Sequence, residues 1–300
     1  MPLVSIIMNC YNGSSYLGKA IDSVYAQKFL DWEIIFWDNA STDESGTIAK
    51  SYDKRLKYFR TEKNTPLGEA RNSALSKVSG KYIGFLDCDD IYLPDKLLRQ
   101  INILENTDYA MVYSGAMIID QKDSLIGIKI PKNVSGYIFP NLLVDYEINM
   151  QSVMLRKSKL DELDYNFDTS LKFCPDYNLF MHIAAEFNVG IIKEALVKYR
   201  ILPNSLSNQT VDLAGNEINR SLDQVFARFP ELKLKYVDEA KAAYAKVHFY
   251  NAISFIHKSN YHHARSELRK IIFERWEYFT LYFILFFSIP KSVVLKLLGR

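Results

Sequence analysis

Short apolar runs alternate with helical patterns along the first third of the chain. The helical pattern is clearest over 15–27, where apolar residues recur at the spacing of one helix face. These residues are Leu17, Ala20, Ile21 and Val24. Apolar runs separated by such helices predict an α/β fold with a mostly parallel sheet and crossover helices. The expected strands are Leu3–Met8, Glu33–Trp37, Leu56–Phe59, Tyr82–Leu86 and Tyr109–Tyr113.

Helix-start signals punctuate the same region. Ser41 followed by Glu44 resembles a capping box for a second helix. Pro66 and Pro94 stand where the first turn of a helix tolerates proline. The helices expected after these prolines are Arg71–Val78 and Asp95–Glu105.

The middle of the chain has a weaker pattern, and its end is helical. A helix is expected over Tyr177–Phe187, and strand signals stop at about Gly215. We therefore expect an α/β part over 1–210 and a helical region over 211–300. The strand-like segments of the middle part are Leu125–Ile130, Val153–Arg156, Val189–Ile192 and Ala195–Ile201.

Composition adds an asymmetry of charge. The 300 residues are 48% hydrophobic and 24% charged, which indicates a folded core and no disorder. The net charge of +2 argues against nucleic-acid binding by the whole chain. Residues 241–300 nevertheless hold ten Lys or Arg against three Glu. The basic charge is therefore concentrated in the tail.

The cysteines and the N-terminus indicate a cytoplasmic protein. Cys10, Cys88 and Cys174 have no CxxC spacing and cannot all pair within the chain, so a disulfide framework or a structural zinc site is not expected. A reducing cytosol fits this usage. The first residues lead into Leu3–Met8 without a basic start or a small-residue cleavage site, so they predict a strand and not a secretory signal.

Polar clusters follow three of the expected strands, at 9–13, 38–43 and 87–90. In a parallel α/β sheet, ligands bind beyond the carboxyl ends of the strands. Any one cluster is consistent with ordinary turn and cap chemistry. Three clusters at one edge of one sheet favour a ligand site.

Asp87 and Asp89 are the sharpest feature of that edge. In an extended segment, residues two apart point the same way, so both carboxylates can face one site. A hard divalent cation is the natural group to lie between them, and magnesium or manganese bound in this way usually also binds substrate phosphates. The alternative is that Asp89 or Asp90 caps the helix that begins near Pro94.

A nearly complete P-loop competes with this interpretation. Residues 13–20 follow a strand and open a helix with the spacing GxxxxGK. Ala20 stands where a Ser or Thr hydroxyl should reach magnesium, and the bulky Tyr16 and Leu17 are unusual in a phosphate-binding loop. An NTPase is therefore disfavoured. The absence of GxGxxG likewise weakens a dehydrogenase.

The order of these motifs resembles family 2 glycosyltransferases with the GT-A fold. The resemblance covers 3–105. The matching positions are 4–7, 11–12, 16–17, 21–24, Gln27, 32–35, Asp38, 41–43, Gly68-Glu69-Ala70-Arg71-Asn72, the run 80–90 and Pro94.

The resemblance implies transfer of a sugar from a nucleotide-sugar donor with inversion at the anomeric carbon. Tyr11 resembles the aromatic residue beside the base, with Asn9 near it. Asp38 resembles the carboxylate that accepts a hydrogen bond from the base, commonly uracil, and Arg71 resembles the nucleotide-contacting arginine. The departures are Asn9-Cys10 in place of Pro-Thr and Asn39-Ala40 in place of Asp-Gly.

Asp87 and Asp89 match the DxD motif of the family, whose last Asp is the expected ligand of Mn²⁺ or Mg²⁺. An inverting displacement also needs a base that takes the proton of the acceptor hydroxyl. Family members usually have an acidic residue that opens a helix 80 to 100 positions after the DxD motif, and Asp176 resembles it, although Pro175 departs from the usual Glu-Asp. The alternative role of Asp176 is N-cap of the helix 177–187.

Tyr199-Arg200 followed by 204–207 resembles the segment that closes over the diphosphate. Arg200 is thus a candidate phosphate contact, and a surface arginine is the alternative.

The tail holds thirteen uncharged residues, Tyr278–Pro290, between basic segments. A helix of that length spans about 20 Å, less than the roughly 30 Å of bilayer hydrocarbon. Its basic flanks, which include Lys291, Lys296 and Arg300, suit an interfacial helix on an anionic leaflet. The alternative is a helix packed on the catalytic domain or on another subunit of an oligomer.

Together these features predict a metal-dependent inverting glycosyltransferase with a GT-A catalytic domain over 1–210. Its nucleotide-binding half is 1–113 and its acceptor-side half is 114–210. A UDP-sugar is the favoured donor, and a glycan or lipid-linked hydroxyl is the acceptor, as in bacterial surface-polysaccharide assembly. The protein is expected on the inner face of the cell membrane. The alternative is a non-catalytic nucleotide-sugar sensor or scaffold of the same fold.

Overall fold

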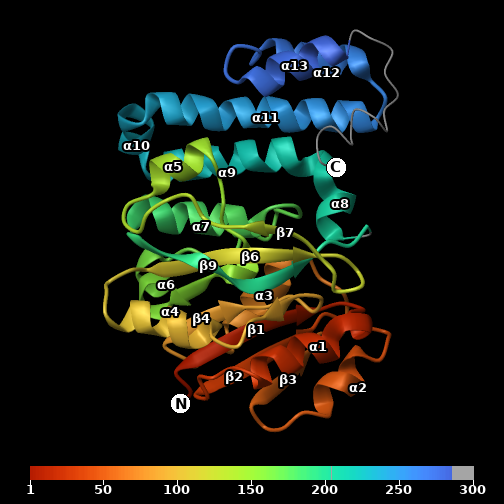
Figure 1. Cartoon of the computed structure of the whole chain (residues 1–300), viewed down its shortest axis with the longest axis vertical. Coiled ribbons are helices and arrows are strands. Elements are labelled where there is room, and N and C mark those ends of the chain that lie inside the picture. The colour runs from red at the N-terminus through yellow and green to blue at the C-terminus, as the bar shows by residue number, and fades with distance from the viewer. Residues whose placement is uncertain (204, 286–300) are drawn as a thin grey trace. The chain divides into compact units, whose positions relative to one another are not determined.

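The computed structural model describes residues 1–203 and 205–285 (Figure 1). The chain divides into two compact units. Unit 1 comprises Met1–Leu142, Tyr146–Leu171 and Pro175–Pro203, and unit 2 comprises Leu143–Asp145, Lys172–Cys174 and Asn204–Arg300. The end of the predicted apolar stretch, 286–290, and its flanking Lys291, Lys296 and Arg300 lie outside the described residues, as does Asn204.

A nine-stranded sheet forms the centre of unit 1, in the order β3-β2-β1-β4-β8-β6-β9-β5, with β7 paired to β6. The first four strands of this order all run parallel, and so do β6 and β9. Antiparallel pairs join β4 to β8, β8 to β6, β9 to β5 and β6 to β7. The strands are β1 (Val4–Cys10), β2 (Trp32–Asp38), β3 (Leu56–Arg60), β4 (Tyr82–Phe85), β5 (Ile91–Tyr92), β6 (Met111–Ile119), β7 (Leu125–Lys129), β8 (Met154–Arg156) and β9 (Val189–Arg200).

Helices flank this sheet (Figure 1). The predicted apolar stripe of the first helix is buried in the core that β1 and β2 also build. Burying this stripe stabilises the helix more than its local propensity does. The helices are α1 (Ser14–Tyr25), α2 (Ser45–Lys50), α3 (Leu67–Leu75), α4 (Lys96–Glu105), α5 (Phe139–Val144), the 3₁₀ turn η1 (Met150–Ser152), α6 (Lys157–Leu163) and α7 (Pro175–Glu186).

Unit 2 is helical in its described part. A core of small and aliphatic residues on α11 and α12, among them Ala252, Ile256 and Leu268, packs with Leu281 of α13. None of the described helices combines the length and the apolar character that crossing a membrane requires. The elements are α8 (Leu206–Thr210), η2 (Val211–Leu213), α9 (Ala214–Arg228), α10 (Pro230–Lys235), α11 (Val237–His257), α12 (Tyr261–Arg269) and α13 (Trp276–Ile284).

Three local expectations are wrong. The capping box does not form, because α2 begins at Ser45 and the Ser41 hydroxyl instead accepts the N–H of Asn12. Asp176 lies in the first turn of α7 and is not its N-cap, since the helix already begins at Pro175. The segments 189–192 and 195–201 form one strand, β9, whose register shifts beside Gly115.

Candidate active site

Three loops meet at one edge of the sheet, after β1, β2 and β4. The first and second loops are joined by two hydrogen bonds: the Asn12 N–H donates to Ser41 Oγ at 3.0 Å, and the Thr42 N–H donates to Asn12 Oδ1 at 2.8 Å. The third loop contacts the first, because Cys88 Sγ donates to the Asn9 carbonyl at 3.2 Å. The polar clusters predicted to share one edge are therefore adjacent.

The P-loop interpretation of the first loop is wrong. A phosphate-binding loop needs free backbone N–H groups. The Gly13 N–H instead donates to Ser45 Oγ at 3.0 Å, and the Ser14 N–H donates to Asp43 Oδ2 at 2.9 Å. Lys19 forms an ion pair at the surface. The backbone donors of this loop are thus used inside the protein.

Asp38 has no exposed surface and is surrounded by its own partners. Its Oδ2 accepts hydrogen bonds from the Tyr58 hydroxyl and from Arg60 Nη1, the latter at 2.8 Å, and its Oδ1 accepts the Ser41 N–H at 2.7 Å. These bonds tie β2, β3 and the second loop together. The expected contact of Asp38 with a base stays a prediction.

Tyr11 and Asn9, the two other residues expected to contact the base, each present a group that a ligand could bind. The ring of Tyr11 is 55% exposed. Nδ2 of Asn9 is buried without a hydrogen-bond partner in the described part of the chain. A buried amide N–H₂ without a partner is costly, so it is well suited to a ligand that supplies an acceptor.

Asp87 is held by a residue that sequence reasoning missed. Gln151, in η1, donates from Nε2 to Asp87 Oδ2, and its Oε1 accepts the Asp87 N–H at 2.9 Å. This two-point contact fixes the first carboxylate of the DxD motif. Since 64 residues separate the two, no local pattern could have shown the pairing.

The next two carboxyl groups, those of Asp89 and Asp90, are buried close to each other and to Asp87. Burial and the Asp87 charge raise the pKa of Asp89 to about 6. Burial, followed by the charge of Asp89, raises the pKa of Asp90 well above its usual value. Asp90 Oδ1 accepts the Arg200 N–H at 2.7 Å, whereas its Oδ2 is buried and has no partner among the described residues. Burial and mutual repulsion thus both oppose the ionisation of Asp89 and Asp90.

A divalent cation at this place would favour the ionised form of these carboxyl groups. Asp87 and Asp89 present oxygen ligands, which hard cations prefer, and Mg²⁺ or Mn²⁺ often completes its shell with water and substrate phosphate. Within 1–203 and 205–285, no group of three or more His, Cys, Asp or Glu residues is arranged to hold a metal ion by itself. If a divalent ion binds here, Asp87 and Asp89 are the residues that would hold it.

Arg200 is fully buried, so the surface-arginine alternative is wrong. Its Nε donates to the Asp89 carbonyl at 2.8 Å, and its Nη1 donates to the Asp120 carbonyl at 2.9 Å and pairs with Asp123 at 2.6 Å. The guanidinium also lies 4.3 Å from the centroid of the Tyr16 ring. Arg200 thus joins the end of β9 to the backbone of the DxD loop. Its expected phosphate contact stays a prediction.

Arg71 and Asp176 face each other from α3 and α7. Nη1 of Arg71 lies 3.8 Å from Asp176 Oδ1. Arg71 is 5% exposed, yet its Nε and Nη1 make no hydrogen bond within the described residues. Burial raises the pKa of Asp176, and the charge of Arg71 opposes that rise. A buried arginine with free donors is suited to an anionic ligand.

Charge coupling shows that the predicted acidic residues share one region. The charge of Asp87 contributes to the raised pKa of Asp176. The pKa of Tyr199, next to Arg200, is raised to about 12 by burial and then by four carboxylates. These are Asp90, Asp87, Asp89 and Asp176. The loop after β4, the start of α7 and the end of β9 therefore lie close enough for their charged groups to interact.

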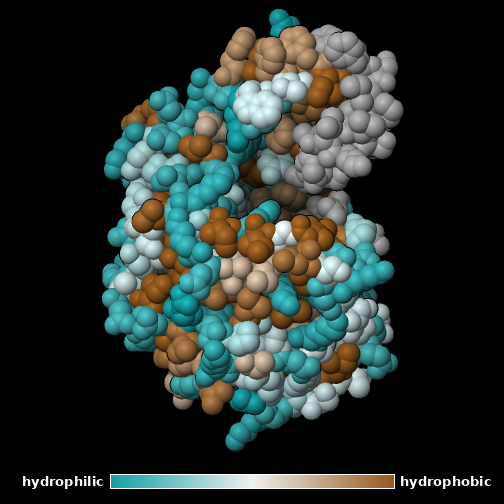
Figure 2. Space-filling model, in the orientation of Figure 1, coloured by the Kyte–Doolittle hydropathy of each residue, from teal (hydrophilic) through white to brown (hydrophobic). Residues whose placement is uncertain are grey.

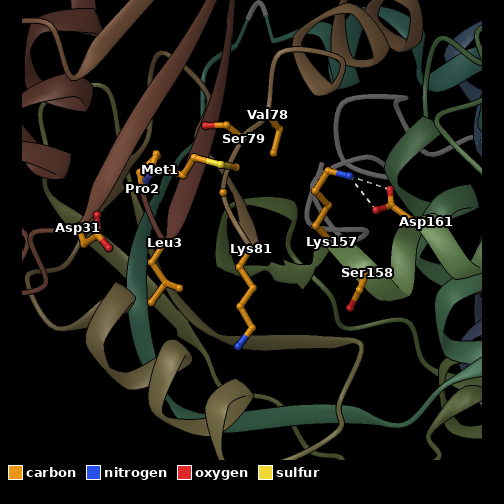
Figure 3. A pocket seen from close by; sticks show the side chains of 11 residues that line it. Met1, Pro2, Leu3, Asp31, Val78, Ser79, Lys81, Lys157, Ser158 and Asp161 are labelled. Carbon is orange, nitrogen blue, oxygen red and sulfur yellow. Dashed lines mark hydrogen bonds and ion pairs between the residues drawn. The ribbon is translucent and has the colours of Figure 1, made fainter.

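A cavity of about 700 Å³ opens beside the residues that precede β1 and β4, away from this edge (Figure 3). Both of its lysines have partners, because Lys81 pairs with Glu105 and Lys157 pairs with Asp161. It holds none of the predicted site residues. Its lining residues are Met1, Pro2, Leu3, Asp31, Val78, Ser79, Gly80, Lys81, Lys157, Ser158 and Asp161.

Known proteins resemble this chain in sequence and in fold. Residues 5–161 match the family described as Glycosyl transferase family 2. An uncharacterized glycosyltransferase of Rickettsia prowazekii is 36% identical over 233 residues, which are 74% of this chain and 70% of that protein. The UDP-Glc:alpha-D-GlcNAc-diphosphoundecaprenol beta-1,3-glucosyltransferase WfgD of Escherichia coli is 27% identical over 234 residues, 75% of this chain and 90% of that protein.

A solved structure shows the same fold. The mannosyltransferase PcManGT from Pyrobaculum calidifontis, in complex with GDP-Man and Mn²⁺, matches with a TM-score of 0.60 and 15% identity, over 99% of this chain and 79% of that chain. The predicted GT-A fold is confirmed. With its acidic loop and buried arginines at the carboxyl edge of this sheet, the chain belongs to glycosyl transferase family 2.

Proposed function

We propose that this glycosyltransferase moves a sugar, with inversion and metal assistance, from a nucleoside-diphosphate sugar to an acceptor hydroxyl. The observation that carries the proposal is the meeting of an under-neutralised carboxylate pair, Asp87 and Asp89, with a buried arginine that has free donors, Arg71. A cation and a diphosphate satisfy both groups at once. Asp176, beside Arg71, is the candidate base.

Each residue has a defined task in this reaction. The leaving group is a nucleoside diphosphate, and a divalent cation, when bound, neutralises the charge that develops on it. Asp87 and Asp89 hold that cation, while the free N–H groups of Arg71 donate to phosphate oxygens. Asp176 accepts the proton of the acceptor hydroxyl, and burial raises its pKa, which makes its carboxylate a stronger base.

A UDP-sugar is the favoured donor, and the transferred group is a hexosyl or N-acetylhexosaminyl residue. WfgD is named for UDP-Glc, which supports uracil as the base of the donor nucleotide. The exposed ring of Tyr11 offers a stacking surface for the base, and the free amide of Asn9 offers it a donor. Contact between Asp38 and the base requires that the Asp38 carboxylate give up a hydrogen bond that it now accepts from Ser41, Tyr58 or Arg60.

The acceptor is a hydroxyl of a glycan or of a lipid-linked saccharide, and the enzyme works on the inner face of the cell membrane. The name of WfgD contains a diphosphoundecaprenol-linked acceptor, which supports a lipid-linked substrate. Such an acceptor stays in the membrane, so an enzyme that uses it must work at the bilayer surface.

Two conservative variants test the proposal. With UDP-sugars and Mn²⁺, Asp176→Asn is expected to lower the turnover number by roughly 100-fold or more while donor binding persists, because only the base is lost. Asp89→Asn is expected to abolish Mn²⁺-dependent UDP binding in a calorimetric titration. The control is Asp95→Asn, an exposed carboxylate at the start of α4 whose removal leaves both readouts unchanged.

The same assays distinguish an enzyme from a non-catalytic sensor. A sensor binds donor with Mn²⁺ but releases no UDP in the presence of any acceptor. Wild-type turnover in Asp176→Asn removes that residue from the role of base. Metal-dependent binding that survives in Asp89→Asn contradicts the metal site.

A further inference from the structure

Two buried thiols lie side by side at the carboxyl edge of the sheet. Cys10 is the last residue of β1, and Cys88 lies in the loop after β4. Their side chains are 2% and 9% exposed, and neither is part of a disulfide. The two thiols are hydrogen-bonded to each other, and Cys88 Sγ also donates to the Asn9 carbonyl. The proposed metal site therefore has a pair of thiols beside it.

The register of the sheet explains why the two cysteines meet. β1 and β4 pair in parallel, and the last residues of this pairing are Ile7 and Phe85. The Leu86 N–H continues the ladder by donating to the Ile7 carbonyl at 3.0 Å. Counted on in the same register, Cys10 stands opposite Cys88. Adjacent strands are about 4.8 Å apart, which lies within the range of about 4.4 to 6.8 Å between the Cα atoms of a disulfide.

A glycine leaves room for the pair. A Cβ atom on Gly13 would lie 2.9 Å from Cys88 Cβ, which is closer than real Cβ atoms come. The same atom would lie 3.1 Å from Cys10 Sγ and 3.3 Å from Cys88 Sγ. Both sulfurs therefore border one small space at the start of α1, and the absence of a side chain on Gly13 keeps that space open.

A bond between the sulfurs would move the acidic loop. Cys88 stands between Asp87 and Asp89, the two carboxylates proposed to hold the cation. Cys10 is fixed in the sheet, because β2 pairs with it and the Asn39 N–H donates to its carbonyl at 2.7 Å. Bonded sulfurs lie about 2.05 Å apart, well inside hydrogen-bond distance, so the loop of Cys88 must make most of the approach. Functional side chains tolerate displacements of only about 0.5 Å.

We propose that Cys10 and Cys88 form an oxidative modification site, at which a peroxide converts the two thiols into a disulfide and the displaced acidic loop then binds metal and donor more weakly. The effect on binding rests on the proposed function, in which Asp87 and Asp89 hold the cation. Formation of the disulfide does not.

The chemistry needs hydrogen peroxide as the only added reagent. One thiol, as its thiolate, attacks a peroxide oxygen, so the O–O bond breaks and a sulfenic acid and one water form. The second thiol attacks the sulfenic sulfur, so the S–S bond forms, the S–O bond breaks and a second water leaves. The two thiols together lose two electrons and two protons, and the peroxide is reduced to water. A dithiol such as dithiothreitol reverses the change by exchange.

A small polar oxidant can approach this edge through water. The helices that follow the first two loops, α1 and α2, expose polar side chains, among them Ser15, Lys19, Asp22 and Thr47. Figure 2 shows mainly hydrophilic and intermediate residues at the surface where Figure 1 draws these two helices. Cys88 is the more exposed of the two cysteines and lies in a loop.

Thiol counting and mass spectrometry test the bond without any substrate. The chain has three cysteines, so the full-length protein treated with hydrogen peroxide and then denatured should titrate with one free thiol instead of three. Its mass should fall by about 2 Da, the two hydrogens lost. Peptide mapping should show Cys10 joined to Cys88, with Cys174 free. Cys174→Ala is the matched control that should still form the bond, whereas Cys10→Ser and Cys88→Ser should not.

Calorimetric titration with UDP and Mn²⁺ measures the consequence. Oxidised wild type is expected to bind roughly tenfold more weakly than reduced wild type, because the metal-holding carboxylates are displaced, and dithiothreitol should restore the affinity. Each variant is compared with itself before and after peroxide, so a change in its basal affinity does not enter the result. Cys10→Ser should lose the response to peroxide, and Cys174→Ala should keep it.

The two measurements separate the possible failures. Three free thiols after oxidation, or a bond that includes Cys174, would show that Cys10 and Cys88 are not the reactive pair. A Cys10–Cys88 bond that leaves Mn²⁺-dependent UDP binding unchanged would show that the disulfide does not control the site. Reduced wild type that fails to bind UDP with Mn²⁺ counts against the proposed function alone, because the thiol count still decides whether the modification site exists. That count uses the wild type, so it holds even if a serine variant does not fold.

Discussion

Ala40 has a φ of +67°, a region that L-residues with a Cβ enter only at a cost. It stands in the loop after β2, where family members commonly have glycine. Ala40→Gly is expected to raise the free energy of unfolding by about 1 kcal/mol, because glycine adopts this backbone without the clash. Urea unfolding measures the change. The same substitution at Ala74, buried in α3, should cost about 1 kcal/mol. If Ala40→Gly also lowers the free energy of unfolding, the positive φ of Ala40 does not destabilise the protein.

Lys96 is a lysine with no exposed surface and no carboxylate partner among the described residues. Its Nζ donates to Gln100 Oε1 at 2.7 Å and lies 4.0 Å from the centroid of the Tyr92 ring. Burial lowers its pKa well below the usual value. The unfolded chain therefore binds a proton that the folded protein excludes, at every pH between the folded pKa and about 10.4.

Stability should accordingly rise with pH because of this residue. Relative to Lys96→Met, the wild type is expected to gain at most about 1.4 kcal/mol of unfolding free energy per pH unit across that window. Urea unfolding at about pH 7 and about pH 9.5 measures the difference. Lys54→Met, an exposed control on unit 1, should leave the pH dependence unchanged. If the difference in unfolding free energy between wild type and Lys96→Met is the same at both pH values, the Lys96 amine is charged in the folded protein.

At the scale of the elements, Arg200 links the end of β9 to two loops. It binds the DxD loop through the Asp89 carbonyl and binds the turn between β6 and β7 through Asp120 and Asp123. Its Nη2 is buried and has no partner within the structure as described. One donor therefore remains for a ligand, while the others keep the acidic loop in place.

Removing this side chain should cost far more than removing a surface arginine. Arg200→Met is expected to lower the free energy of unfolding by about 3 kcal/mol, because it leaves the part-buried carbonyls of Asp89 and Asp120 and the carboxylate of Asp123 without their donor. Arg99→Met removes the exposed pair with Glu194 and should cost no more than about 1 kcal/mol. Chemical denaturation compares the two. Equal losses would show that burial adds nothing to the Arg200 contacts.

For the whole molecule, the pH dependence of turnover follows from the pair Arg71 and Asp176. A base must be ionised, so at saturating donor and Mn²⁺ the turnover number should fall about tenfold per pH unit below the pKa of Asp176. Arg71 opposes the rise in that pKa. Arg71→Met should therefore move the acid limb of the pH profile to higher pH. If the acid limb of the turnover profile lies at the same pH in wild type and in Arg71→Met, Arg71 does not influence the ionisation of Asp176.

The elements that carry the first part of the site were predictable because their signals are local. The apolar runs of β1, β2 and β4 and the stripe of α1 follow simple periods, and the polar residues after the strands mark one edge of a parallel sheet. The short elements β5, α5 and α6 escaped prediction, because a few residues cannot show a period. The split of β9 into two expected strands arose at its register shift, where the alternation is interrupted.

By itself, the sequence determined the fold class and the family, since these depend on order and spacing along the chain. The roles of the acidic and basic residues at the edge of the sheet stay predictions. Only the tertiary structure decided that Gln151 holds Asp87, that Arg200 is buried against Asp123 and that Asp38 is occupied by Tyr58 and Arg60. It also decided which rings of α13 are exposed. The physical reason is that burial and partner choice depend on packing between segments far apart in the chain, which no local period encodes.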